Sequence, residues 1–449
     1  MARIRPFRGL FYNQQKINNI NNVITPPYDV ISPEEQEKFY NKSPYNSIRL
    51  SLGKRFPSDT QDYNCYTRAK DFFEKWREED ILLQDKEPSI YFSKQIFSLP
   101  GGKKKVRTGF ISLVCLEEFE KRVIIPHERT LHHPKIDRFN LIRACKANFC
   151  PIIGIYSDPR YHIDHIVGEV FKRSPFIEFT DNQGITNQVW KVIDEPLIKE
   201  IIREMEDKVL YIADGHHRYE TAIMFRNSVL KNNAGIKGLH DKYSFDKVMF
   251  YLTNLDDPGL IILPVPRIVY NLPDFDSTVF FKELKKYFYI ESISFNGENE
   301  PEARKLFFRK LKDYEAKNHV FGIYVKGIQN YFLLILKDED FLNTVCGNIP
   351  ARLRKLNVNI LEQIVFLQIL GISKEDLKAQ SKVVYFHDNQ VAIEKTNKDN
   401  YNIAFLLNPV KIDDLREICS AGERMPQKST YFSPKFLSGL VINKIDLPD

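Results

Sequence analysis

The chain has 449 residues, of which 43% are hydrophobic and 28% charged, a composition typical of a globular protein with two or three structural units. Its formal net charge of +6 is mild for this length, so it suits an anionic small substrate and lacks the basic excess of a dedicated nucleic-acid binder. The six cysteines form no CxxC pair, which argues against a zinc ribbon or thioredoxin-like site and suits a reducing compartment.

The sequence contains no targeting or membrane segment that we recognise. Residues 1–6 lack the apolar run of a signal peptide, and no window approaches the ~20 apolar residues of a membrane helix. We therefore expect a soluble, cytoplasmic protein without a membrane partner. The sequence leaves its oligomeric state open.

The first 270 residues alternate predicted strands and helices. Ser32, Pro33 and Glu35 predict a helix start, because serine can cap, proline suits the first helical position and glutamate completes a capping box. Hydrophobic periodicity and turn residues predict the other elements. Helices are expected over 62–79, 136–147, 162–172 and 195–207, and strands over 89–99, 104–116, 151–156, 176–180, 188–193, 209–213, 247–254 and 260–263.

The segment over 273–345 has the pattern of an inserted or appended αβ subdomain. No linker rich in glycine, serine or proline separates it from its neighbours, so we expect tight docking. Helices are predicted over 277–287, 301–317 and 359–370, and strands over 320–326, 331–337, 377–386 and 401–407.

The most informative stretch is YIADGHHRYETA at 211–222. A predicted buried strand ends there in an acid and a glycine, and a helix follows. The backbone N–H groups at the start of that helix attract phosphate or carboxylate. Gly215 lets the anion approach the backbone, Arg218 can add a bidentate fork, and His216 and His217 can add donors or shuttle a proton.

Asp214 is the unusual member of this stretch, because a carboxylate repels an anion bound beside it. It suits the site if it binds a metal ion or accepts a proton from a hydroxyl. The alternative is that Asp214 caps the helix and the histidines are incidental. Five such residues in a row favour a functional site.

A second candidate segment covers 421–432. Arg424, Lys428, Ser429 and Thr430 supply donors for a second anion, or for the far end of the same one. The alternative is a solvated loop with a capping serine.

Two further segments carry charged side chains. HERT at 127–130, with Asp137, Arg138 and Asn140, could form a metal-like or acid/base cluster. It lacks the HExxH spacing of a zinc protease, and a structural ion-pair network explains it equally well. Asp29 follows the rigid turn at Pro27, where an Asx turn is a sufficient explanation.

Common phosphate-binding motifs are missing from the sequence. It has no GxxxxGK[ST] loop, no GxGxxG after a strand, and neither the HRD nor the DFG element of protein kinases. Any phosphate chemistry must therefore use another scaffold.

The motifs resemble those of a known superfamily. DGHHR at 214–218, followed by an alanine-bearing helix, resembles the phosphate-binding box of the ParB/sulfiredoxin superfamily, and more closely that of its free serine kinases. PPYDVIS at 26–32, HERT with DR and N within 127–140, ADGHHRYETA at 213–222 and MPQKSTYFSPK at 425–435 resemble a widespread bacterial and archaeal family of that superfamily.

The resemblance implies an α+β fold: a ParB/sulfiredoxin-like core of mixed sheet and helices with an additional αβ subdomain. Residues 1–270 would form the catalytic region with insertions. Residues 271–380 would form the αβ subdomain, and residues 381–449 a C-terminal segment that returns to the site.

The resemblance also implies an activity. Free serine kinases phosphorylate the hydroxyl of L-serine to give O-phosphoserine, a precursor for cysteine synthesis, with ADP, ATP or pyrophosphate as donor. His216, His217 and Arg218 would bind the donor phosphates, and Asp214 would lie beside the transferred group. The general base would be Glu128, with Asp29 as second choice.

Phosphoryl transfer requires alignment and charge neutralisation more than covalent help. Arg218, Lys428 and the helix N-terminus could supply it, with a Mg²⁺ ion bridging the donor. Arg424 or Arg138 could bind the carboxylate of the amino acid. The sequence shows no adenine-recognition pattern, which slightly favours pyrophosphate as donor.

Two other readings compete with the kinase. The same anion site could serve a nucleotide or phosphate-ester hydrolase. A ParB-like DNA-binding protein is suggested by a helix-turn-helix-like pattern over 359–378, but its second helix begins with two acids in three residues, so a nucleic-acid partner is disfavoured.

Overall fold

The chain folds into two compact units. This computed structural model describes residues 1–99, 102–128, 132–233, 243–347 and 349–448. The first unit combines residues 1–126, 130–261 and 434–449, and the second combines 127–129 and 262–433. The expected boundary was at 270/271, and residues 381–433 were expected in a separate C-terminal segment rather than in the second unit.

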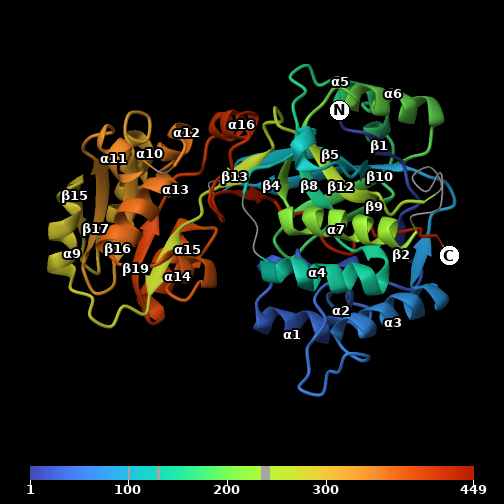
Figure 1. Ribbon diagram of the computed structural model, residues 1–449, viewed down its shortest axis with the longest axis horizontal. Helices are drawn as coiled ribbons and strands as arrows, with labels where there is room; N and C mark the ends of the chain where they lie inside the picture. The colour runs from blue at the N-terminus through green and yellow to red at the C-terminus, as the bar shows by residue number, and fades with distance from the viewer. Residues whose placement is uncertain (100–101, 129–131, 234–242, 348, 449) are drawn as a thin grey trace. The chain divides into compact units, whose positions relative to one another are not determined.

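A nine-stranded sheet forms the centre of the first unit (Figure 1). Its order is β6-β11-β8-β12-β5-β4-β10-β9, with β1 also paired to β5. The β6–β11 and β8–β12 pairs are parallel and the others antiparallel. The strands are β1 Ile4–Arg5, β4 Ile90–Ser98, β5 Lys104–Cys115, β6 Ile124–Pro126, β8 Ile152–Tyr156, β9 Ile177–Thr180, β10 Thr186–Val192, β11 Leu210–Asp214 and β12 Lys247–Asn254.

Helices α5, α6 and α7 cover one face of this sheet. Ile163, Ile201 and Ala222, one from each helix, share a core with Phe92 and Phe110 of the strands. Helix α4 packs on α7, and α3 packs on α4 (Figure 1). The helices are α1 Pro33–Lys42, α2 Ile48–Ser51, α3 Cys65–Glu78, α4 His132–Cys145, α5 His162–Ile166, α6 Glu195–Met205 and α7 His216–Asn232. Two short two-stranded sheets pair β2 Leu10–Tyr12 with β3 Leu82–Gln84 and β7 Ala147–Asn148 with β21 Asn443–Lys444.

The second unit has an antiparallel six-stranded sheet of order β15-β17-β16-β19-β14-β18. Phe307 and Leu311 of α10, with Ala392 and Ile393 of α15, join one core with its strands. The strands of this sheet are β14 Arg267–Tyr270, β15 Phe288–Ser294, β16 Val320–Val325, β17 Asn330–Leu336, β18 Val383–Tyr385 and β19 Tyr401–Leu406, and a separate pair joins β13 Ile261–Leu263 to β20 Tyr431–Ser433. The helices are α9 Ser277–Leu284, α10 Glu300–Tyr314, α11 Phe341–Val345, α12 Ala351–Arg354, α13 Asn357–Ile360, a π-helix Leu361–Ile369, α14 Lys374–Ala379, α15 Asn389–Lys398 and α16 Ile412–Ser420.

Most predicted elements of the first unit are present within a few residues of their expected bounds. The capping box of α1 forms as expected, with Ser32 accepting from the Glu35 N–H and Glu35 accepting from the Ser32 N–H. The strand expected over 377–386 is wrong in its first half. There a second capping box, between Ser373 and Asp376, starts α14, and only Val383–Tyr385 is extended.

The mixed sheets and helices agree with an α+β chain, while the ParB/sulfiredoxin assignment stays a prediction. Helix α14 has six residues and two acids in its first turn, which makes it a poor recognition helix. Among the described residues, no helix is both long and apolar enough to cross a membrane.

We predict that Tyr219→Phe lowers the free energy of unfolding by about 1–3 kcal/mol, because it leaves two buried peptide groups unpaired. The Tyr219 hydroxyl donates to the Glu117 carbonyl at 2.7 Å and accepts from the Glu117 N–H at 3.0 Å, which ties α7 to the end of β5. Urea denaturation measures the loss. Tyr289→Phe, at a residue that is 63% exposed, is the matched control, and equal effects of the two variants would contradict this anchor.

Candidate functional site

The turn between β11 and α7 requires glycine for two reasons. Strand β11 ends at Asp214, Gly215 has a φ of 95°, and α7 begins at His216. A Cβ atom at position 215 would lie 2.9 Å from the guanidinium of Arg218. Gly215 adds no side-chain cap to α7, whose N-terminal end carries partial positive charge.

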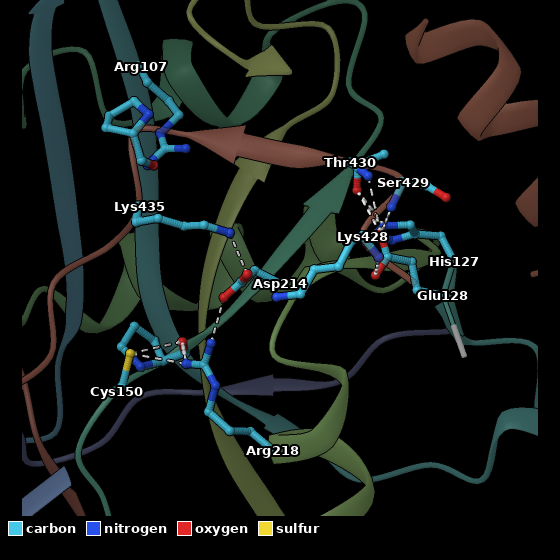
Figure 2. Close-up of polar contacts among 12 residues, drawn as sticks. Arg107, His127, Glu128, Cys150, Asp214, Arg218, Lys428, Ser429, Thr430 and Lys435 are labelled. Carbon is cyan, nitrogen blue, oxygen red and sulfur yellow. Dashed lines mark hydrogen bonds and ion pairs between the residues drawn. The ribbon is translucent and has the colours of Figure 1, made fainter. Parts of the chain in front are cut away.

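The carboxylate of Asp214 lies between two cations (Figure 2). Arg218 Nη2 donates to Oδ2 at 2.7 Å, and Lys435 Nζ donates to Oδ1. The three side chains are only 11–12% exposed. Two cations and one carboxylate leave this cluster with a net positive charge at the N-terminus of α7. Asp214 therefore does not make the site repulsive to an anion.

The neighbouring charges in this cluster favour the ionised forms of Asp214 and Arg218. Burial alone would raise the pKa of Asp214, but Lys435 and Arg218 lower it far below the usual range of an aspartate. Burial alone would lower the pKa of Arg218, but Cys150, Asp214 and Asp29 raise it above its usual value. Asp214 and Arg218 therefore stay ionised across the physiological range.

Arg218 has contacts beyond Asp214. It donates to Cys150 Sγ at 3.0 Å and to the Pro151 carbonyl, and its Nε has no hydrogen-bond partner among the described residues. Burial raises the pKa of the Cys150 thiol, and the nearby Arg218 offsets part of that increase. Arg218 and Cys150 line a cavity of about 60 Å³ with Tyr28, a volume that suits a few water molecules and no nucleotide.

Asp29 and Arg138 lie in the same unit, but Asp29 is exposed to solvent and Arg138 is buried. Asp29 lies in the 3₁₀ turn Tyr28–Val30. It is close enough to Arg218 for its carboxylate to raise the pKa of the Arg218 guanidinium. Arg138 is buried, and its guanidinium lies 4.0 Å over the Tyr28 ring. It also donates to the Ser51 carbonyl at 2.6 Å and to the carboxylate of Asp137, so its donors are committed within the chain.

A larger groove lies elsewhere in the first unit. It has a volume of about 770 Å³ and is lined by Arg5, Arg8 and Lys444, among others. It shares no residue with the Asp214 cluster.

In the second unit, Glu128 binds the loop over 428–430 (Figure 2). Its two carboxylate oxygens accept from the backbone N–H groups of Lys428 at 3.2 Å, Ser429 at 3.1 Å and Thr430 at 3.3 Å. These backbone N–H groups bind the chain's own Glu128, and the predicted binding of a substrate anion by this loop stays a prediction. A carboxylate committed to three N–H groups is a weak general base.

The surroundings of Glu128 are equally ordered. His127 is fully buried, with its Nε2 2.8 Å from Thr430 Oγ1 and 3.5 Å from Glu128 Oε1. The buried Arg267 donates to the Lys428 carbonyl at 3.1 Å. Arg424 is half-buried in the same unit. Arg129 and Thr130 of the HERT stretch lie outside the described residues.

The structure thus divides the predicted site residues between the two units. Asp214, Gly215, His216, His217, Arg218, Asp29 and Arg138 lie in the first, and Glu128, Arg424, Lys428, Ser429 and Thr430 in the second. Sequence reasoning missed Lys435 and Cys150 as partners. Lys435 closes the motif MPQKSTYFSPK, so its position in that motif was the available signal.

The described residues fit a metal ion poorly. They contain no group of three potential His, Cys, Asp or Glu ligands, and both oxygens of Asp214 already accept from cations. The metal role of Asp214 therefore stays a prediction, and no step below depends on Mg²⁺.

A family model described as "Protein of unknown function (DUF1015)" matches residues 4–359. The chain belongs to this family. A search of curated proteins finds no match.

Several solved structures are remotely similar. A free serine kinase mutant in complex with AMP is 11% identical with a TM-score of 0.36, over 78% of this chain and 95% of that one. A free serine kinase mutant in complex with ADP is 9% identical with a TM-score of 0.35, over 72% and 89%. SbnI from Staphylococcus aureus with a C-terminal truncation is 10% identical with a TM-score of 0.34, over 73% and 85%.

We predict that Asp214→Asn destabilises the protein at neutral pH and that the difference from wild type shrinks in acid. The pKa of Asp214 is lower in the folded state than the unfolded value of about 3.9. Its stabilisation is therefore complete above the unfolded pKa and is lost as pH falls toward the folded pKa. Thermal unfolding of both proteins over an acid-to-neutral series measures this, and a constant difference would contradict it.

We also predict that Glu128→Gln speeds amide hydrogen exchange at Lys428, Ser429 and Thr430, because the amide has one acceptor oxygen and no charge. Exchange followed by mass spectrometry measures the change. Glu339→Gln, at a side chain that is 54% exposed, is the control and should leave exchange at these three amides unchanged. Unchanged exchange at the three amides in Glu128→Gln would show that the carboxylate does not hold the loop.

Proposed function

We propose that this protein is a phosphotransferase that phosphorylates the hydroxyl of free L-serine, with its donor phosphates bound at the N-terminus of α7. The observation that carries the proposal is the shared carboxylate: Asp214 holds Arg218 and Lys435 together with an excess of positive charge at a helix start. Such a place favours doubly charged phosphate oxygens. The DGHHR resemblance supplies the reaction class.

In this proposal the binding roles belong to groups around Gly215. The first turn of α7, with His216 and His217, would contact the donor phosphates. Lys435 and Arg218 would offset the charge that spreads over the equatorial oxygens during transfer. Asp214 would keep both cations in place, which is a positioning role in the chemistry rather than direct proton transfer.

Asp29 is the better general base of the two carboxylates considered. It is exposed and within electrostatic reach of Arg218, whereas Glu128 already accepts three backbone hydrogen bonds. Asp29 would take the proton of the serine hydroxyl as that oxygen forms its bond to phosphorus. The bond between phosphorus and the donor's bridging oxygen breaks, and its electron pair leaves with the shortened donor.

Arg138 is a weak candidate for the serine carboxylate because its donors are committed within the chain. The roles of Arg424, Lys428, Ser429 and Thr430 in binding substrate stay predictions. Pyrophosphate remains slightly favoured as donor over ATP or ADP.

The activity can be tested directly. The purified protein is incubated with L-serine and Mg²⁺ and, in separate reactions, with pyrophosphate, ATP or ADP, and O-phosphoserine is measured by mass spectrometry. We expect phosphoserine with at least one donor. Release of phosphate without phosphoserine would favour the hydrolase, and no reaction with any donor would contradict the proposal.

We predict that Asp29→Asn lowers kcat by on the order of 10²-fold or more while the KM for the donor changes little, because the variant loses the proton acceptor and keeps the phosphate contacts. Steady-state kinetics with the active donor measure both constants. Asp62→Asn, at another exposed aspartate, should keep wild-type kinetics. A wild-type kcat in Asp29→Asn would exclude Asp29 as the base.

A further inference from the structure

Arg107 is a buried cation in the middle of β5 that none of the roles above uses. It is 0% exposed, and its Nη2 donates to Gln95 Oε1 and to the carbonyl of Pro434. The residue after Pro434 is Lys435, one of the two cations on Asp214. Arg107 therefore holds the backbone immediately before a proposed site residue (Figure 2).

Three polar side chains form one row across the sheet at this point. Gln95 of β4 lies opposite Arg107 of β5, and Asn187 of β10 lies opposite Gln95. Gln95 Nε2 donates to Asn187 Oδ1 at 3.0 Å and approaches the Lys435 carbonyl at 3.5 Å. The row thus contacts two consecutive carbonyls of the C-terminal segment.

The residue on the other side of Lys435 is also fixed. Phe436 stacks on Tyr251 of β12, with ring centroids 4.6 Å apart and ring planes at 26°. The carbonyls of Pro434 and Lys435 accept from side chains of the sheet, and the ring of Phe436 is stacked. The backbone of Lys435 is therefore held on both sides, while its side chain reaches Asp214 through Nζ.

Stability alone does not explain an arginine at this position. Its Nε and Nη1 have no hydrogen-bond partner among the described residues, and its guanidinium lies 5.2 Å from the centre of the Tyr251 ring. Burial lowers the pKa of Arg107, which reflects the cost of its charge there. Replacing a buried, incompletely paired charge by an apolar side chain of similar size is often neutral or stabilising.

We propose that Arg107, through the Pro434 carbonyl and with Gln95, is a positioning residue that sets the place of Lys435 on Asp214. The inference rests on the proposed function for its kinetic consequence, but the positioning itself can be measured without any activity.

The first test measures the reactivity of Lys435 in Arg107→Met. The folded protein is acetylated briefly with an amine-reactive ester, and modification of Lys435 is quantified by peptide mass spectrometry, with the exposed Lys374 as internal reference. We expect Lys435, 11% exposed in the wild type, to react several-fold faster in the variant at a temperature where both proteins are fully folded.

The matched control is Arg267→Met. Arg267 is also a buried arginine that donates to a backbone carbonyl, that of Lys428, in the second unit. The Arg267→Met variant should leave the labelling of Lys435 unchanged. Unchanged labelling of Lys435 in Arg107→Met would overturn the proposal. If that variant does not fold, Gln95→Met, which removes the acceptor of the same guanidinium, is judged by the same labelling criterion.

The second test is a double-mutant cycle with Lys435→Met in the phosphoserine assay. If Arg107 acts through Lys435, Arg107→Met lowers kcat by roughly tenfold or more in the wild-type background and has no further effect when Lys435 is absent. Additive losses would show that Arg107 acts independently and would overturn the proposal. If the wild type transfers no phosphate to serine, the proposed function fails, and the labelling result still decides the positioning role.

Discussion

The rest of the site depends on one shared carboxylate. Asp214 ends β11 and accepts from Arg218, one helical turn later, and from Lys435, more than two hundred residues later in the chain. Because both partners are nearly buried, removing the carboxylate would leave two cations close together at the positive end of a helix. The interaction thus joins the strand, α7 and the C-terminal segment into one arrangement with a net positive charge.

Local sequence rules predicted much of the fold and part of this arrangement. The strand that ends at Asp214, the glycine turn and the helix that follows could be read from residues 209–222, since the signals for a buried strand, a φ above zero and a helix start are all local. The capping box at Ser32 was predictable for the same reason. A helix after Ser373 was considered as part of a helix-turn-helix-like pattern, but the strand that follows was predicted to begin at 377, whereas the structure has a helix to Ala379 and a strand only from Val383.

Long-range pairing is what the sequence could not provide. No periodicity places Lys435 on Asp214 or Arg107 on the Pro434 carbonyl, because these contacts depend on how separate strands are ordered in the sheet. The choice of Glu128 as general base has the same cause. A glutamate is a suitable residue type for a base, but the sequence does not show that its oxygens accept from three backbone N–H groups about 300 residues later in the chain.

The proposed function requires that the N-terminus of α7, with its two cations, binds phosphate groups. Isothermal titration of the full chain with inorganic pyrophosphate can measure this binding in wild type, Lys435→Met and Lys444→Met. Lys444 lines the separate groove of the first unit. We expect saturable binding by wild type, a large loss of affinity in Lys435→Met and none in Lys444→Met. Equal binding by wild type and Lys435→Met, or a loss confined to Lys444→Met, would contradict the proposed binding site.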